Sequence, residues 1–232
     1  MHAIILAGGF GTRLSGVVSD VPKPLAPIAG RPFIAWLADY LIAQGITEIT
    51  FSVHHQWQKI CDYFSAHTLK VPVHYVVEET PLGTGGAMAH ALKSLNIAEP
   101  VLVLNGDSFA RVDYRALYAQ HQKSGAKLTM VLREVADTER YGTVSEKNGA
   151  VVSFGPGQAG KAGLINAGIY VMHPQLFAEP GLPAAFSFER DFLPSQLPTL
   201  MPRSFHAEGY FVDIGIPEDY ARACKELPRM VG

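Results

Sequence analysis

Short apolar runs alternate with amphipathic stretches through the first half of the chain. The runs HAIILA, ITEITFSV, VPVHYVVEE and EPVLVLNGD have the length and composition of buried strands. Between them lie PFIAWLADYLIAQG, QWQKICDYFSAH and GTGGAMAHALKSLN, whose apolar residues recur at helical spacing. This β-α-β order predicts parallel strands joined by crossover helices.

The second half predicts a mixed arrangement. Asp113 precedes the helical stretch YRALYAQHQKSG as an N-cap, and KLTMVLREV returns to the sheet. YGTVSEKNGAVVSFG reads as a hairpin turning at Asn148-Gly149, and LINAGIYVMH as a further strand. The segment GYFVDIGIPEDYARACKEL predicts a strand, a turn and a helix that begins at Pro217. Because no linker, repeat or low-complexity tract interrupts the chain, we expect one domain over residues 1–232.

Composition excludes several classes of partner. The 232 residues are 48% hydrophobic and 17% charged, with a net charge of −2 and a pI near 6.5, so neither nucleic acid nor a membrane is expected as a partner. Cys61 and Cys224 lie far apart, without metal-ligand spacing, which favours reduced thiols. The chain does not open with a basic segment and a long apolar run, so we expect a cytoplasmic protein. Composition leaves homo-oligomerisation open.

The first candidate binding segment is the glycine-rich loop in AIILAGGFGTRL. A dinucleotide fingerprint counted from Gly9 needs a third glycine where Leu14 stands, and a Walker loop from Gly8 needs Gly-Lys at Arg13 and Leu14. Both fingerprints therefore fail. What remains is a loop after a buried strand whose backbone N–H groups, with Thr12 and Arg13, favour a polyphosphate over the alternative of a simple tight turn.

Lys23 supports the polyphosphate interpretation. It lies between Pro22 and Pro24, which restrict the backbone on both sides, so its position is stiffer than a solvated surface lysine needs. We therefore expect Lys23 to be a second phosphate ligand.

Two aspartates follow apolar strands in matching positions. Asp107 follows VLVLNG and Asp213 follows GYFV. Ligands of open α/β sheets collect at the carboxyl ends of strands, and paired carboxylates suit Mg²⁺. The alternative is that Asp107 caps a turn and Asp213 caps the final helix.

Other motifs carry weaker signals. EETPLGTGGA lets backbone approach a base or ribose at Gly83, Gly85 and Gly86, or is only a helix start capped by Thr84. The nine histidines lack metalloprotease spacing and are interpreted as structural or peripheral, and no G-x-S-x-G elbow supports acyl transfer.

Taken in order, LAGGFGTRL, KPLAPIAGRP, PLGTGGA, LNGDS, RYGTV, LINAGIYV and DIGIPEDY resemble the sugar-1-phosphate nucleotidyltransferases over nearly the whole chain. PLGTGGA, LNGDS, FSFERDFL and GYFVDIGIPEDY most resemble the D-glycero-α-D-manno-heptose 1-phosphate guanylyltransferases within that superfamily, followed by mannose-1-phosphate guanylyltransferases. The resemblance implies a Rossmann-like, three-layer α/β/α mixed sheet of the nucleotide-diphospho-sugar transferase type. It also implies a nucleotide-binding half over about residues 1–110 and a sugar-binding half over about 111–232.

The resemblance also implies site residues. Base and ribose are contacted by backbone at Leu6, Ala7, Gly8 and Gly9 and by the segment from Glu78 to Gly86, and the β and γ phosphates by Gly11, Thr12 and Arg13. Lys23 contacts the reacting phosphates, Asp107 and Asp213 bind Mg²⁺, and Tyr141, Gly142, Asn166 and Gly168 line the sugar pocket. The superfamily's Glu-Lys pair after the hairpin is missing, since this chain reads GPGQAGKAG, and Lys161 is the nearest cation that can replace it, unless it is an incidental lysine on a solvated loop.

The implied reaction transfers GMP from GTP to the heptose 1-phosphate, giving a nucleoside-diphosphate sugar and pyrophosphate for surface polysaccharide. A mannose-1-phosphate or other hexose-1-phosphate enzyme is the alternative of the same class. A non-catalytic nucleotide-sugar sensor is the alternative of a different class, but a sensor does not need Arg13, Lys23, Asp107 and Asp213 together.

Overall fold

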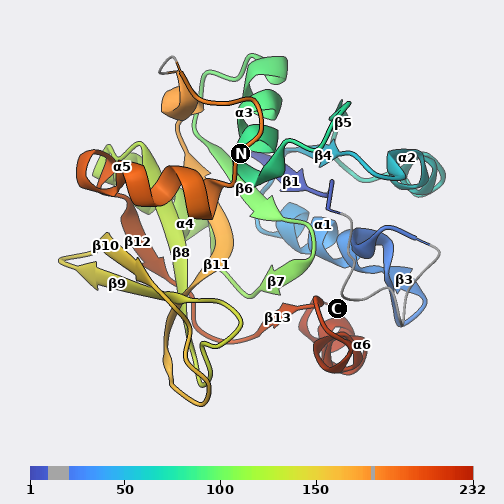
Figure 1. Cartoon of the computed structure of the whole chain (residues 1–232). Helices are drawn as coiled ribbons and strands as arrows, with labels where there is room; N and C mark the ends of the chain where they lie inside the picture. Colours follow the sequence, from blue (N-terminus) through green and yellow to red (C-terminus); the bar gives the residue numbers. More distant parts are fainter. Residues whose placement is uncertain (10–20, 179–180, 232) are drawn as a thin grey trace. The chain divides into compact units, whose positions relative to one another are not determined.

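A computed structural model describes residues 1–9, 21–178 and 181–231 of the chain (Figure 1). They form two compact units, the first made of Met1–Pro81, Leu104–Ala110 and Tyr210–Gly232 and the second of Leu82–Val103 and Arg111–Gly209. Arg13, Thr12 and Gly11 lie outside the described residues. Among the helices that are described, none is long and apolar enough to cross a membrane.

The first unit is built on three parallel strands. Its elements are β1 (His2–Leu6), η2 (Lys23–Leu25), β2 (Pro27–Ile28), β3 (Arg31–Pro32), α1 (Phe33–Ala43), β4 (Glu48–Val53), α2 (Trp57–Ala66), β5 (Val73–Val77), β7 (Ser108–Ala110), β13 (Phe211–Asp213) and α6 (Pro217–Val231). Strand β4 pairs in parallel with β1 on one side and with β5 on the other (Figure 1). The predicted β-α-β order of this region is confirmed, with α1 and α2 as the crossover helices.

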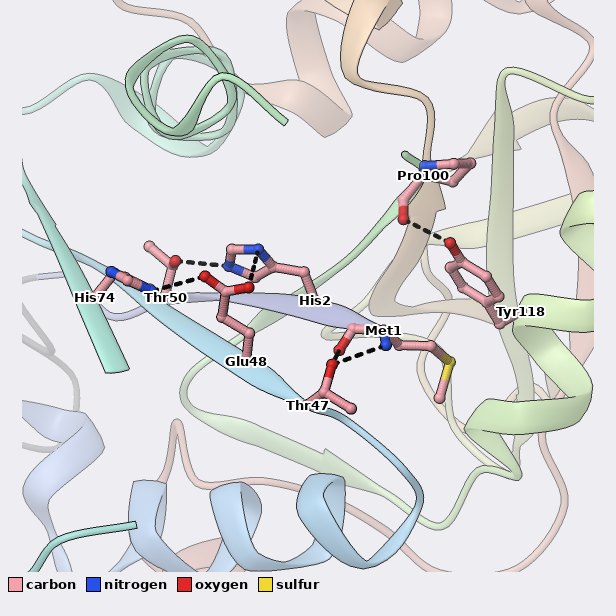
Figure 2. Close-up of polar contacts among 8 residues, drawn as sticks. All are labelled: Met1, His2, Thr47, Glu48, Thr50, His74, Pro100 and Tyr118. Atoms are coloured by element: carbon pink, nitrogen blue, oxygen red, sulfur yellow. Dashed lines mark hydrogen bonds and ion pairs between the residues drawn. The ribbon is translucent and has the colours of Figure 1, made fainter. Parts of the chain in front are cut away.

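The register of these strands aligns their two ends. His2 pairs with Glu48 at the amino ends, where the Glu48 carboxylate lies 2.7 Å from His74 Nε2 and 3.7 Å from His2 Nδ1 (Figure 2). At the carboxyl ends, the Ala7 amide donates to the Ser52 carbonyl at 2.7 Å, and the Glu78 amide donates to the Val53 carbonyl at 2.8 Å. The loops that follow β1, β4 and β5 therefore meet at one edge of the sheet.

The second unit contains antiparallel and parallel pairs. Its elements are α3 (Gly83–Leu95), α4 (Tyr114–Ser124), β8 (Leu128–Val135), β9 (Thr143–Lys147), β10 (Ala150–Gly155), β11 (Gly163–Met172), η3 (Pro174–Phe177), the π-helix η4 (Phe188–Phe192), α5 (Leu193–Leu200) and β12 (Arg203–His206). Strand β8 pairs antiparallel with β11 and parallel with β12, and β10 pairs antiparallel with β9 and β12. Strand β6 (Val101–Asn105) belongs to both units. The mixed sheet predicted for the second half is confirmed.

Local signals in the second unit were predicted correctly. The Asp113 carboxylate accepts a hydrogen bond from the Ala116 amide at 2.9 Å and caps α4. Asn148 and Gly149 have φ of 53° and 71°, the left-handed pair that a two-residue hairpin turn requires. The sequence did not predict β7, β12 or the π-helix, which are short and lack a clear period.

Candidate functional site

The charged centre of the first unit is Lys23, which lies between two carboxylates. Its Nζ donates to Asp107 Oδ2 at 2.6 Å and to Asp213 Oδ1 at 3.4 Å. The lysine side chain is 12% exposed, whereas the aspartates are 38% and 27% exposed. The structure therefore brings together three residues that the sequence predicted to act jointly.

A small two-stranded sheet places the two aspartates. Strand β7 pairs antiparallel with β13, with Ser108 opposite Asp213, and the Ile214 amide donates to the Asp107 carbonyl at 3.0 Å. Asp213 Oδ1 also accepts from the Gly215 amide at 2.8 Å. A Cβ at Gly215 would lie 3.0 Å from Asp213 Oδ1 and 3.3 Å from Lys23 Nζ, so glycine leaves the room that the ion pair occupies.

The segment that carries Lys23 is held by its own backbone hydrogen bonds and by a bond from the C-terminal helix to Pro27. It opens the 3-10 helix η2, where the Leu25 amide donates to the Pro22 carbonyl at 2.8 Å. The Tyr220 hydroxyl of α6 donates to the Pro27 carbonyl at 2.6 Å. These contacts agree with the interpretation of Lys23 as a restrained cation.

The donor set at this centre fits a magnesium ion. Carboxylate oxygens are hard ligands, and Mg²⁺ commonly takes one or two of them and completes its shell with water and phosphate oxygens. Asp107 and Asp213 both reach the same ammonium, so both can face the same cation. Within the part of the chain that the structure describes, no group of three His, Cys, Asp or Glu residues has metal-binding geometry.

The start of the glycine loop lies against Glu78. A Cβ at Gly8 would approach Glu78 Oε1 to 2.9 Å and the His54 Cβ to 3.2 Å, so a side chain there would force the Glu78 carboxylate to shift. Among the described residues, no atom lies within 4 Å of a Cβ at Gly9. The Ser52 hydroxyl donates to Glu78 Oε1 at 3.2 Å, and His54 Nδ1 lies 2.8 Å from the Glu78 carbonyl oxygen. Glu78 is only 6% exposed. Leu6, Ala7, Gly8 and Glu78 thus meet at one sheet edge, and their contact with base and ribose stays a prediction.

In the second unit, the glycines that open α3 pack against the chain near Phe186. The Gly85 and Gly86 amides both donate to the Phe186 carbonyl, at 3.0 and 3.3 Å. A Cβ at Gly83 would lie 2.6 Å from that oxygen, and one at Gly85 would overlap the Phe186 ring. Close packing therefore explains these glycines, and their contact with a nucleotide stays a prediction.

The alternative that Thr84 caps this helix is wrong. The helix begins at Gly83 with Leu82 in the cap position, so Thr84 lies inside the first turn. Its hydroxyl donates instead to Glu189 Oε2 at 2.6 Å.

The predicted sugar residues fall in two places of the second unit. Asn166 and Gly168 lie where the β11–β8 register shifts, and the Gly168 amide donates to Asn166 Oδ1 at 3.0 Å. The Tyr141 and Gly142 amides both donate to the Thr138 carbonyl, at 3.0 and 3.2 Å.

Thr138 also holds the loop that carries Lys161. Its amide and its hydroxyl each lie 3.1 Å from the Lys161 carbonyl, and the hydroxyl accepts from the Gln158 amide at 3.1 Å. Hydrogen bonds from the Glu139 and Gly160 amides lower the pKa of the neighbouring Asp137 carboxyl. The Lys161 side chain is exposed, and its backbone carbonyl and the Tyr141 and Gly142 amides all hydrogen-bond to Thr138.

Sequence reasoning missed several residues of these clusters. Ser52 and His54 had no local signal, because their roles depend on strand ends that meet only in the fold. Gly215, Tyr170 and Glu189 had one, since they lie in motifs that carry the family resemblance, DIGIPEDY, LINAGIYV and FSFERDFL.

Comparison with known proteins shows which proteins the chain is similar to. The chain is 38% identical over 231 residues to a D-glycero-α-D-manno-heptose 1-phosphate guanylyltransferase of Aneurinibacillus thermoaerophilus, covering 100% of both chains. It is 40% identical over 221 residues to the protein with the same name in Campylobacter jejuni, covering 95% of this chain and 97% of that one. A mannose-1-phosphate guanylyltransferase catalytic subunit beta of Dictyostelium discoideum is 31% identical, and the match covers 95% of this chain and 62% of that protein.

Solved structures of nucleotidyltransferases are similar to the chain as well. The crystal structure of HddC from Yersinia pseudotuberculosis complexed with GMP-PN superposes with a TM-score of 0.84 at 36% identity, covering 97% of this chain and 98% of that one. A UDP-glucose pyrophosphorylase complexed with UDP-glucose shares the fold at 20% identity, with a TM-score of 0.80. Residues 2–229 match the nucleotidyl transferase family, and the chain belongs to it.

Proposed function

We propose that this enzyme transfers GMP from GTP to D-glycero-α-D-manno-heptose 1-phosphate and releases pyrophosphate. The observation that carries the proposal is Lys23 held between Asp107 and Asp213, in a chain similar over its full length to two heptose 1-phosphate guanylyltransferases. A single cation between two carboxylates provides one positive charge for phosphate and two oxygen ligands for a metal.

The proposed chemistry needs no protein nucleophile. An oxygen of the sugar phosphate attacks the α-phosphorus of GTP in line, and the bond from that phosphorus to the pyrophosphate oxygen breaks. Positioning and charge neutralisation supply most of the rate in reactions of this kind. When bound to Asp107 and Asp213, Mg²⁺ supplies positive charge against the phosphates.

The chain's own residues then have distinct roles. Lys23 offsets negative charge at the α-phosphorus, and Arg13 stabilises the departing pyrophosphate. The backbone from Leu6 to Gly9, with Gly11, Thr12 and the segment from Glu78 to Gly86, holds the nucleotide. Tyr141, Gly142, Asn166, Gly168 and Lys161 hold the sugar 1-phosphate.

A substrate matrix tests this function. Purified protein with Mg²⁺ is mixed with GTP, ATP, UTP, CTP or dTTP and with the heptose 1-phosphate, mannose 1-phosphate or glucose 1-phosphate, and pyrophosphate release is measured. We expect the highest kcat/KM for GTP with the heptose 1-phosphate. A preference for mannose 1-phosphate would replace the sugar assignment, and no pyrophosphate with any pair would overturn the enzymatic function.

A further inference from the structure

The Glu189 carboxylate gathers three hydroxyl groups within the second unit. Thr84 Oγ1 donates to Oε2 at 2.6 Å, Ser187 Oγ donates to the same oxygen at 3.3 Å, and Tyr170 Oη donates to Oε1 at 3.1 Å. These donors come from α3, from the residue before the π-helix, and from β11. A carboxylate accepts but cannot donate, so each of the three hydroxyl protons must point toward Glu189.

On the Tyr170 side, the hydrogen bonds run in one direction. The Gly168 amide donates to Asn166 Oδ1 at 3.0 Å, so Asn166 Nδ2 is the atom that faces Tyr170 Oη, at 2.7 Å. Tyr170 accepts from Asn166 and gives its own proton to Glu189. The tyrosine is fully buried, and burial together with the Glu189 charge raises the pKa of its hydroxyl well above the ordinary value, so it remains a donor. This series of hydrogen bonds therefore fixes the orientation of the Asn166 side-chain amide.

On the Thr84 side, the direction is also fixed. The Phe188 amide donates to Thr84 Oγ1 at 2.9 Å, so the threonine hydroxyl uses its proton for Glu189. Thr84 lies in the first turn of α3, between Gly83 and Gly85, where the backbone already packs against Phe186. Glu189 thus ties the first turn of α3 to the π-helix.

We propose that Glu189 is a positioning residue for both substrates. Through Tyr170 it orients the Asn166 amide toward the sugar 1-phosphate, and through Thr84 it holds the first turn of α3 for the nucleotide. This inference rests on the proposed function, because Asn166 and Gly83–Gly86 are assigned to the two substrates there.

Three variants separate the contact through Tyr170 from the contact through Thr84. Tyr170→Phe removes only the hydroxyl between Asn166 and Glu189, and we expect KM for the sugar 1-phosphate to rise about five-fold or more while KM for GTP stays within about two-fold. Thr84→Val should instead raise KM for GTP and leave KM for the sugar 1-phosphate within about two-fold of the wild type. Glu189→Gln keeps the size of the side chain but cannot accept from all three hydroxyls, so it should raise both KM values. In the double variant Tyr170→Phe/Glu189→Gln, KM for the sugar 1-phosphate should equal that of Glu189→Gln alone, because both changes break the same series of hydrogen bonds.

The matched control is Arg190→Gln, an exposed neighbour on the same π-helix, which should leave both KM values unchanged. Thermal unfolding of each variant is measured beside the kinetics. If Glu189→Gln does not fold, Tyr170→Phe and Thr84→Val decide whether Glu189 is a positioning residue. Unchanged KM values in Tyr170→Phe and Thr84→Val, or a fall in kcat alone that follows lost stability, would overturn the positioning role. The wild-type assay with the same substrates stands apart, since its failure would reject the proposed function rather than this inference.

Discussion

Lys23 and Asp107 form the shortest ion pair of the candidate site, with Nζ 2.6 Å from Oδ2 although 84 positions separate the two residues in the chain. Asp213 joins them at 3.4 Å from a position 190 residues away from Lys23. The site thus depends on three distant segments, and substitutions in each test it independently.

Asp107→Asn and Asp213→Asn should each lower kcat by about two orders of magnitude, because an amide binds Mg²⁺ poorly and leaves the phosphate charge less compensated. Circular dichroism and thermal unfolding should show an intact fold. Steady-state pyrophosphate release at several Mg²⁺ concentrations measures the effect. Activity within a few-fold of the wild type in both variants would remove the metal assignment.

Arg13→Ala should lower kcat more than it raises KM for the sugar 1-phosphate, because a guanidinium directed at the leaving pyrophosphate acts mainly in the transition state. Lys23→Ala should impair both constants, since its ammonium is assigned to the reacting phosphates. Lys123→Ala, at an exposed position of α4, is the control for loss of one positive charge. A pure loss of sugar-phosphate affinity in Arg13→Ala would contradict the leaving-group role.

Lys161→Ala should raise KM for the sugar 1-phosphate several-fold with little change for GTP, because an uncompensated phosphate in a closing site costs several kcal/mol. The backbone of its loop is tied to Thr138, so removing the side chain should not disturb the fold. Lys147→Ala, on the β9–β10 hairpin, is the matched control. Unaltered kinetics in Lys161→Ala would leave the phosphate charge to Lys23 and Arg13.

Gly85→Ala should destabilise the protein by about 1–3 kcal/mol, because the added methyl group overlaps the Phe186 ring in a packed region. Chemical denaturation monitored by fluorescence measures the free energy of unfolding. Gly9→Ala is the control for stability, since no atom of the described residues lies within 4 Å of a Cβ at that position. Equal stability of the two variants would show that α3 does not need glycine for this packing.

His121 makes stability depend on pH. It is buried with its Nδ1 2.9 Å from Thr129 Oγ1, and burial, aided by the nearby His173, lowers its pKa from 6.5 to about 4. Between these values the unfolded chain binds the proton and the folded chain does not, so the stability from neutral His121 is complete above about pH 6.5 and is lost as the pH falls toward 4. His121→Gln should lose about 1–3 kcal/mol less than the wild type between pH 7.5 and 4.5 in denaturation experiments. An identical pH dependence in the two proteins would exclude His121 as the cause.

How much of this protein follows from its sequence depends on how local each signal is. The apolar runs that became β1, β4 and β5, the Asp113 cap of α4 and the Asn148-Gly149 turn each depend on a few neighbouring residues, and all were predicted correctly. Lys23, Asp107 and Asp213 could be named as candidates because strand-end positions and flanking prolines are visible in the chain.

Only the tertiary structure decided what those candidates touch. The β7–β13 pairing that sets Asp107 beside Asp213, and the meeting of Thr84, Tyr170 and Glu189, join segments separated by many residues. The same holds for Gly83 and Gly85, where an added side chain would meet Phe186, and for Gly86, where it would meet the Ala184 carbonyl, in each case about a hundred positions away. Periodicity, capping and turn preference act within one helix turn or one strand and are therefore written in the sequence, whereas these contacts arise only when long-range strand pairing and packing bring distant segments together.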